Sequence, residues 1–203
     1  MSSEHARDLA ARAACAVLFT LLSMNLLAEF LRTGHITGML LLTSESLIVV
    51  LTIARRRAQV VDRSFAAAAM TMLSVAGPPL LRPSAAAPLA GDAMTAAMSA
   101  AGLIVVIAAK LTLGRSFGIV PANRGVVARG PYNIVRHPIY TGYVITHFAF
   151  VMAHPTVWNA AVVLVADSAL IVRALLEERV LASDSSYQAY CTRVAWHLVP
   201  GLF

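Results

Sequence analysis

Apolar residues fill long stretches of this chain, and polar residues interrupt them only briefly. In the first half, several stretches approach the roughly 20 mainly apolar residues that a helix needs to cross a bilayer. They are residues 9–31, 36–54, 64–81 and 93–113. This pattern predicts an all-α protein, a polytopic transmembrane helical bundle.

The second half begins with the least apolar segment of the chain, residues 114–138. The apolar pattern then resumes, and His154-Pro155 interrupts it. We therefore predict a helical hairpin with arms at 139–153 and 156–181, whose first arm is short for a full crossing. Counted with the earlier stretches, this gives about five spans, the last of them a hairpin.

A loop divides the chain in two. Residues 82–92 contain Pro83, Pro88 and Gly91, residue types that are typical of turns and loops. We predict that residues 1–92 form N-terminal transmembrane helices. Residues 93–203 then form a second region, which holds the hairpin, a polar tail and most of the chemistry-bearing residues.

The composition supports a membrane protein and argues against other classes. Hydrophobic residues make up 59% of the chain and charged residues 13%, whereas about a quarter of a soluble domain is charged. Lysine and arginine are not interleaved with aromatic residues, so no nucleic acid partner is expected. Cys15 and Cys191 have no metal-ligand spacing around them, and we expect neither a disulfide nor a metal site.

Positive charge predicts the orientation. The connections at 32–35 and 82–92 carry only Arg32 and Arg82. The other basic residues lie in the N-terminal segment, in the connection 55–63, or from Lys110 onward. This alternation places both termini and the segment 114–138 in the cytoplasm. Lys110 would extend its ammonium group to the membrane surface.

Residues 129–143 collect arginines, a histidine and tyrosines between apolar segments. Pro138 fixes its own φ and disfavours the helical conformation at His137, so we expect an ordered bend just before a helix. Such a bend directs side chains and free backbone N–H groups to one place, which favours a site for an anionic ligand. The alternative is a loop whose Arg and Tyr side chains anchor the membrane interface.

A second polar cluster lies near the end of the hairpin. It consists of Asp167, Arg173, Glu177, Glu178 and Arg179. Arg173 and Glu177 are four residues apart and share a helix face, whereas Glu178 lies about 100° around the helix, close to the face of Asp167. Ionisable groups inside a membrane span usually mark function, although a helix end with solvated charges is the plainer alternative.

These motifs carry a resemblance. The run GPYNIVRHPIYTGY (130–143) is followed by Arg173, then by EERVL (177–181), YQAYCTRV (187–194) and a final LVPG. In this order and spacing they resemble the isoprenylcysteine carboxyl methyltransferase family, membrane enzymes that use S-adenosylmethionine. The resemblance covers roughly residues 110–203. It implies a methyltransferase whose cytosolic cofactor pocket is built by the C-terminal half, so that 93–203 is the catalytic region.

The resemblance also implies roles for individual residues. Glu177 would contact the cofactor and Arg173 would face the methyl acceptor, which makes them the expected catalytic residues. The other implied cofactor-binding residues are Arg124, Gly125, Val126, Val127, Tyr132, Arg136, His137, Pro138, Ile139, Tyr140 and Glu178. A Phe-Gly pair that is usual before the YxxY segment is replaced here by Asp184-Ser185, a departure that bears on the conformation of the tail.

The residue chemistry suits S-adenosylmethionine, with S-adenosylhomocysteine as the product. A carboxylate can hold its ammonium group, aromatic faces can hold its cationic sulfonium, and an arginine or a helix N-terminus can hold its carboxylate. Glu177, Tyr132, Tyr140, Arg136 and the helix start at Pro138 supply these groups.

The acceptor stays open between several lipophilic classes: a prenylated small molecule, a membrane lipid or another small molecule. A carboxylate of the isoprenylcysteine type is already ionised at neutral pH and needs no base, and Arg173 could orient it. A phospholipid amine or a thiol would need a base, for which Glu178 and His137 are the candidates. The oligomeric state is not readable from the sequence.

Two rival classes share some of these features. NADPH-dependent sterol-type reductases resemble the same architecture, but they tend to carry an acid after the glycine of the central motif, where this chain has Tyr143. A channel would need polar groups spread over several spans. Of the isolated polar residues, Glu45 is expected to hydrogen-bond across helices, to Asn25. His147 and His154 are expected to serve packing or the interface.

Overall fold

The computed structural model describes the chain continuously from residue 36 to its last residue and describes only scattered positions before that. The described residues are 9, 12–13, 16–17, 19–21, 23–24, 27–28, 31 and 36–203. The described part is mostly helical, as predicted. Its helices are α2 (Ile36–Ala54), α3 (Phe65–Ala76), α4 (Asp92–Leu113), α5 (Pro138–Ala153), α6 (Val157–Leu181) and α7 (Ser185–Cys191). Two short strands, β1 (Val60–Val61) and β2 (Ala122–Asn123), and the 3-10 turns Pro78–Leu80, Gly114–Ser116 and Gly130–Asn133 connect them.

The predicted helical hairpin is confirmed. α5 and α6 match the expected arms within a residue, and the turn between them lies at His154-Pro155. Local chemistry explains these ends: Pro138 occupies the first turn of α5, and the Thr156 hydroxyl caps α6 by accepting from the Asn159 N–H at 3.1 Å. His137 has φ −125° and ψ 60°, outside the helical region, as the following proline requires.

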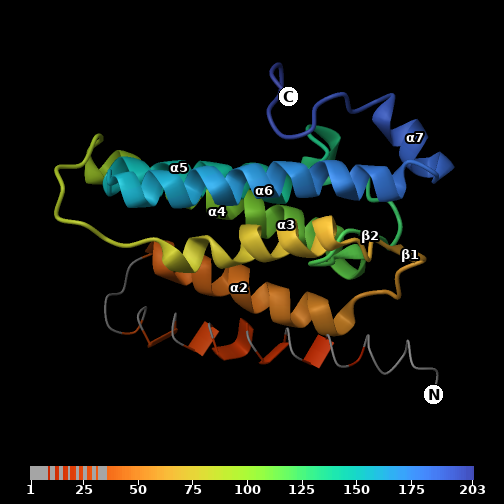
Figure 1. The fold of residues 1–203 in the computed structure, drawn as a ribbon, viewed down its shortest axis with the longest axis horizontal. Coiled ribbons are helices and arrows are strands. Elements are labelled where there is room, and N and C mark those ends of the chain that lie inside the picture. The colour runs from red at the N-terminus through yellow and green to blue at the C-terminus, as the bar shows by residue number, and fades with distance from the viewer. Residues whose placement is uncertain are drawn as a thin grey trace.

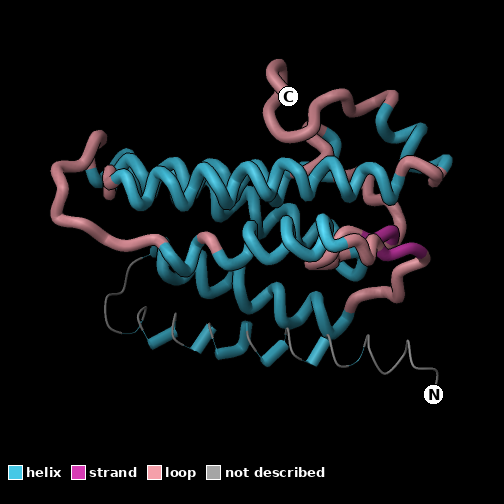
Figure 2. Tube along the Cα trace, in the orientation of Figure 1, coloured by secondary structure: helices cyan, strands magenta, loops and turns pink. Residues whose placement is uncertain are grey.

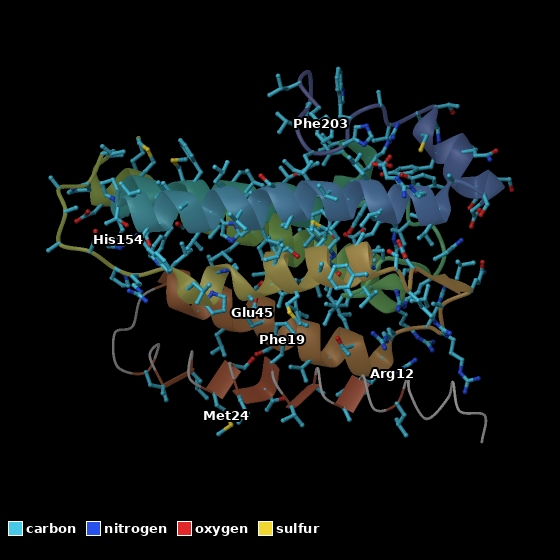
Figure 3. The ribbon with its side chains drawn as sticks, viewed as in Figure 1. Arg12, Phe19, Met24, Glu45, His154 and Phe203 are labelled. Atoms are coloured by element: carbon cyan, nitrogen blue, oxygen red, sulfur yellow. The ribbon has the colours of Figure 1, made fainter. Side chains whose placement is uncertain are left out.

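The long helices lie alongside one another, with α4 packed on α5, α3 on α6 and α2 on α4 (Figure 1). Loop segments gather at the two ends of this bundle (Figure 2). One end carries the loop between α3 and α4 and the turn at His154, which Figure 3 labels, and the other carries β1, β2 and α7 (Figure 1).

Glycines allow the closest contact in the bundle, between α4 and α5. A Cβ at Gly142 would lie 2.6 Å from the carbonyl oxygen of Gly102, and a Cβ at Gly102 would lie 2.7 Å from the carbonyl oxygen of Gly142. Small residues at facing positions are how membrane helices approach closely. This contact fixes α5, and with it the bend that precedes α5, against α4.

A two-residue antiparallel ribbon joins the arginine-rich segments. Val60 pairs with Asn123 and Val61 with Ala122, and the Arg56 N–H donates to the Arg115 carbonyl at 2.7 Å. The two segments therefore lie at the same end of the bundle, which the charge alternation requires of them.

Two of the described helices are long and apolar enough to cross a membrane, Asp92–Ser116 and Val157–Leu181. The apolar helices Met39–Ala54, Phe65–Leu80 and Pro138–Ala153 are shorter. The predicted total of about five spans stays a prediction, and the first candidate span, 9–31, lies partly outside the described residues.

The predicted position of the Lys110 side chain is wrong. Its ammonium group does not reach the surface: Lys110 is fully buried and donates to the Ser44 carbonyl at 2.8 Å and the Ser44 hydroxyl at 2.9 Å. Glu45 Oε1 lies 3.8 Å from the ammonium nitrogen. The reason is that α2 packs on α4 here and offers oxygen partners. Glu45 thus has Lys110 and Ser44 as partners, and the expected partner Asn25 lies outside the described residues.

Candidate functional site

The bend before α5 is held by the C-terminal tail. The Arg136 N–H donates to the Trp196 carbonyl and the His137 N–H to the His197 carbonyl, both at 2.9 Å. The Thr141 hydroxyl donates to the Leu198 carbonyl at 2.7 Å. The expectation that this bend offers free backbone N–H groups to an anion is therefore wrong for Arg136 and His137, because the tail carbonyls occupy them.

Glu178 joins three segments. Its Oε1 lies 2.9 Å from Nε2 of His137 and 2.6 Å from Nδ1 of His197. Its Oε2 accepts from Arg136 Nη1 at 3.0 Å. Arg136 also donates through Nε to the Val194 carbonyl at 2.8 Å. α6, the bend and the tail are thus connected through one carboxylate.

Glu177, the next residue, faces a different environment. It accepts a hydrogen bond from the Tyr140 hydroxyl. Nε of Arg173 lies 3.4 Å from its Oε1, and Nδ1 of His137 lies 3.8 Å from its Oε2. The side chain keeps 22% of its surface exposed, compared with 14% for Glu178. Glu177 therefore has acceptor capacity left for a ligand.

Arg173 lies buried beneath this carboxylate. Its guanidinium stacks over the Tyr140 ring at 5.2 Å and contacts the Ser74 hydroxyl on α3 at 3.5 Å. The Tyr140 ring is in turn stacked with the His137 ring, with centroids 5.4 Å apart. The result is a compact set of one cation, one carboxylate and two aromatic rings.

Residues 122–132 lie at the same end of the bundle, where the C-terminal tail contacts them. The Tyr190 hydroxyl donates to the Tyr132 carbonyl at 2.7 Å, and Val126 packs on the cluster of Tyr187, Tyr190 and Val194. Burial, and after it the negative charge of Glu177, raise the pKa of Tyr132 well above its ordinary value, so this phenol stays protonated.

The chain adopts a positive φ of 95° at Gly125, where the Asn123 side chain accepts from the Gly125 N–H at 2.9 Å. Ser116 donates its hydroxyl to the Arg124 carbonyl at 3.1 Å. Val127 packs on the main core of the bundle. The segment 124–127 is therefore an ordered turn beside the tail.

The unusual Asp184-Ser185 pair has a clear local role. Asp184 is the N-cap of α7 and accepts from the Ser186 N–H at 2.9 Å. Its other carboxylate oxygen accepts from the Asn123 side-chain amide, also at 2.9 Å. The replacement thus leaves the tail ordered and attaches it to β2.

Most of the predicted site residues lie at this end of the bundle. Direct contacts connect Arg136, His137, Tyr140, Arg173, Glu177 and Glu178. Sequence reasoning missed His197, which no spacing rule relates to Glu178, and it missed that Asp167 pairs with His147, with 2.6 Å between Oδ1 and Nδ1. A search for acids and histidines on facing arms of the hairpin would have suggested the second pair.

Two surface hollows lie elsewhere on α6. One, of about 330 Å³, lies between α5 and α6, and the other, of about 250 Å³, lies between α3 and α6. Neither is lined by His137, Tyr140 or Glu177. The cytosolic cofactor pocket therefore stays a prediction.

Comparison with known proteins supports the resemblance to membrane methyltransferases. No curated protein matches this chain. Residues 90–187 match the family model of the phospholipid methyltransferases. The match begins just before α4 and ends inside α7, so it includes the hairpin and both glutamates. The resemblance predicted from the motifs is confirmed: residues 90–187 match the phospholipid methyltransferases, the same membrane methyltransferase family as the isoprenylcysteine carboxyl methyltransferases.

Proposed function

We propose that this protein is an integral membrane methyltransferase that transfers the methyl group of S-adenosylmethionine to a lipophilic acceptor. The observation that supports it most is the environment of Glu177. This carboxylate is partly exposed, is braced by the Tyr140 hydroxyl and by Arg173, and lies beside the stacked rings of Tyr140 and His137.

These groups fit S-adenosylmethionine. Glu177 would hold its ammonium group, and the faces of Tyr140 and His137 would lie along its cationic sulfonium. The cofactor supplies a methyl group on an already activated carbon, so the protein's part is to align the acceptor with it. Arg136 and Glu178 are occupied by each other and by the tail. We propose that they keep the bend in place and contact the cofactor less directly than Glu177 does.

The first candidate acceptor is a carboxylate of the isoprenylcysteine type. It needs no base, and Arg173 is the cation nearest to Glu177. The second candidate is a phospholipid amine, which the description of the matching family favours. A multi-pass arrangement with both termini and the site facing the cytoplasm agrees with the arginine-rich segments that lie together at this end.

Calorimetry on the purified protein in detergent tests the function. S-adenosylhomocysteine should bind and NADPH should not, and the reverse result would overturn the proposal in favour of a reductase. Transfer of a radiolabelled methyl group into phosphoethanolamine lipids and into prenylcysteine analogues, measured in parallel, then decides the acceptor.

A further inference from the structure

A histidine and an aspartate pair in the middle of the hairpin, away from the site around Glu177. Nδ1 of His147 on α5 lies 2.6 Å from Oδ1 of Asp167 on α6. Their side chains are 8% and 16% exposed. Ionisable groups at such a depth in a membrane helix are expensive and usually have a function.

The pairing orients the imidazole. An ionised carboxylate only accepts hydrogen bonds, so Nδ1 of His147 is the nitrogen that donates to Asp167, and Nε2 is the nitrogen left for another partner. Among the residues that the structure describes, Nε2 of His147 has no hydrogen-bond partner. A carboxylate on one ring nitrogen and a free lone pair on the other is the arrangement of a general base.

Tyr143 contacts both His147 and charged groups of the neighbouring helices. The Tyr143 ring stacks on the His147 ring, with centroids 6.2 Å apart. Lys110 on α4 lies 5.4 Å from the same tyrosine ring, with Glu45 on α2 behind it. On α6, the next charged residue after Asp167 is Arg173, which lies over Tyr140. Asp167 is thus the charge that contacts the imidazole directly.

Asp167 of this pair borders a hollow on the outer surface of the hairpin, and His147 lies directly behind it. Asp167 lines the hollow of about 330 Å³ between α5 and α6, whose other lining residues are apolar except Ser168. Pockets of 300 Å³ and more are of a size for small ligands. Phe148 and Leu164, which border the hollow, are 54% and 69% exposed, so the hollow opens on the outer surface of the hairpin. A hydrocarbon chain can therefore enter it sideways.

The base candidates from the sequence are less suitable. Nε2 of His137 is engaged by Glu178, and Glu178 is also engaged by His197 and Arg136. His147 lies seven residues after Tyr140 on α5, about 10 Å along the helix. The cofactor, bound at Glu177, and the acceptor, bound in the hollow, must therefore together extend over this distance for the methyl group to meet the acceptor nitrogen.

We infer that His147, oriented by Asp167, is the base that accepts the proton of a lipid amine whose hydrocarbon chain lies in the hollow between α5 and α6. The inference rests on the proposed methyltransferase function. The ammonium of the acceptor gives a proton to Nε2 of His147, and the freed nitrogen lone pair forms the new N–CH3 bond. The C–S bond of S-adenosylmethionine breaks, its electron pair stays on sulfur, and S-adenosylhomocysteine leaves.

The test of the base combines His147→Gln, Asp167→Asn and His147→Ala with calorimetry and kinetics. We expect His147→Gln to lower methyl transfer to dihexanoyl phosphatidylethanolamine by about 10²-fold or more, while S-adenosylhomocysteine still binds. Asp167→Asn should lower the rate as well. Added imidazole should restore part of the activity of His147→Ala, increasingly as the pH rises.

The imidazole result decides between a base and a structural pair. A pair that only holds α5 to α6 would give a His147→Ala variant that imidazole does not restore, and that result would overturn the inference, as would full turnover in His147→Gln. Absence of S-adenosylhomocysteine binding in the wild-type protein would instead refute the methyltransferase function itself.

A matched pair of variants tests where the lipid binds, by a binding measurement that needs no turnover. Ala160→Phe fills the hollow between α5 and α6, and Ala161→Phe fills the one between α3 and α6. With S-adenosylhomocysteine bound, Ala160→Phe should weaken binding of dihexanoyl phosphatidylethanolamine about tenfold, the effect of losing about two buried methylene groups. Ala161→Phe should bind as the wild type does. Equal effects, or an effect of Ala161→Phe alone, would place the lipid elsewhere.

Discussion

Two neighbouring glutamates illustrate how a single helix step changes the task of a side chain. One step of about 100° turns Glu178 toward the bend and the tail, and leaves Glu177 facing Tyr140 and Arg173. Glu178 is surrounded by His137, His197 and Arg136, whereas Glu177 keeps free acceptor capacity. The two should therefore respond differently to the same substitution.

Glu177→Gln should weaken S-adenosylhomocysteine binding by about 10- to 100-fold, because a hydrogen bond to a charged group contributes about 1.5–3 kcal/mol. Calorimetry measures this, and Glu178→Gln is the matched control. That variant should lower the melting temperature, since it removes the charge that joins the bend to the tail. If Glu178→Gln alone lost affinity, the cofactor would lie on the other carboxylate.

Arg173→Ala should reduce turnover by about 10²-fold and spare S-adenosylhomocysteine binding, because Glu177 still accepts from the Tyr140 hydroxyl. Initial rates and calorimetry on the same preparation separate the two effects. A loss of cofactor affinity in this variant would show that Arg173 belongs to the cofactor site and not to the acceptor site.

The sequence was informative about which residues belong to the candidate site, and much less informative about which residues they contact. The bend at His137 followed from Pro138, and the facing of Arg173 toward Glu177 followed from helix spacing. The contact between His197 and Glu178 depends on how the tail returns over the bend. No local pattern encodes such a long-range return.

Among the helices, the close contact of α4 and α5 determines where the bend lies. The backbone carbonyl of Gly142 would be 2.7 Å from a Cβ at Gly102, and a backbone group cannot move aside as a flexible side chain can. Apolar length and helix breakers were sufficient to predict α2, α4, α5 and α6. The β1–β2 ribbon was not predictable, because two residues per strand are too few to show a period.

Gly102→Ala should destabilise the protein by about 1–3 kcal/mol, because the added methyl group forces α4 and α5 apart. Thermal unfolding in detergent measures the change. Ala101→Val, which adds bulk at the exposed neighbouring position, should leave the melting temperature nearly unchanged. Equal melting temperatures for wild type and Gly102→Ala would mean that α4 and α5 leave room for a methyl group at Gly102.

Asp184 makes the attachment of α7 sensitive to pH. Hydrogen bonds from Ser186 and Asn123 lower the pKa of this carboxyl below its ordinary value. A lowered folded-state pKa adds stability above the unfolded-state pKa of about 3.9, and this stability is lost as the pH falls through the folded value. The destabilisation caused by Asp184→Ala should therefore be largest near neutral pH and shrink in acid, as melting curves over a pH series would show. A pH-independent difference would assign the effect to the cap geometry alone.

For the molecule as a whole, the tail completes the candidate site although it lies mostly outside the matching family region, which ends at residue 187. The tail supplies backbone acceptors to Arg136 and His137 and a side-chain partner to Glu178. The sequence predicted the membrane class and the C-terminal location of the chemistry from composition and motifs. It could not predict that the tail packs over the bend, because the tail has no long apolar stretch and no helical periodicity from which its position could be inferred.

Deleting residues 195–203 should lower S-adenosylhomocysteine affinity by more than about tenfold, since the bend loses two backbone hydrogen bonds and Glu178 loses its partner His197. Calorimetry gives the affinity, and the milder His197→Ala should lose only part of it. Unchanged affinity after the deletion would show that the bend holds its shape without the tail.

The buried Lys110 has a consequence for how the protein is made. An ammonium group left alone in the bilayer is unfavourable by up to about 3 kcal/mol, and its partners, Ser44 and Glu45, lie on α2. During synthesis α2 emerges before α4, so the oxygens that receive Lys110 are already present when α4 enters the membrane. Biogenesis of α4 therefore depends on an earlier helix, and a fragment that starts at residue 90 should insert poorly and be cleared by cellular quality control.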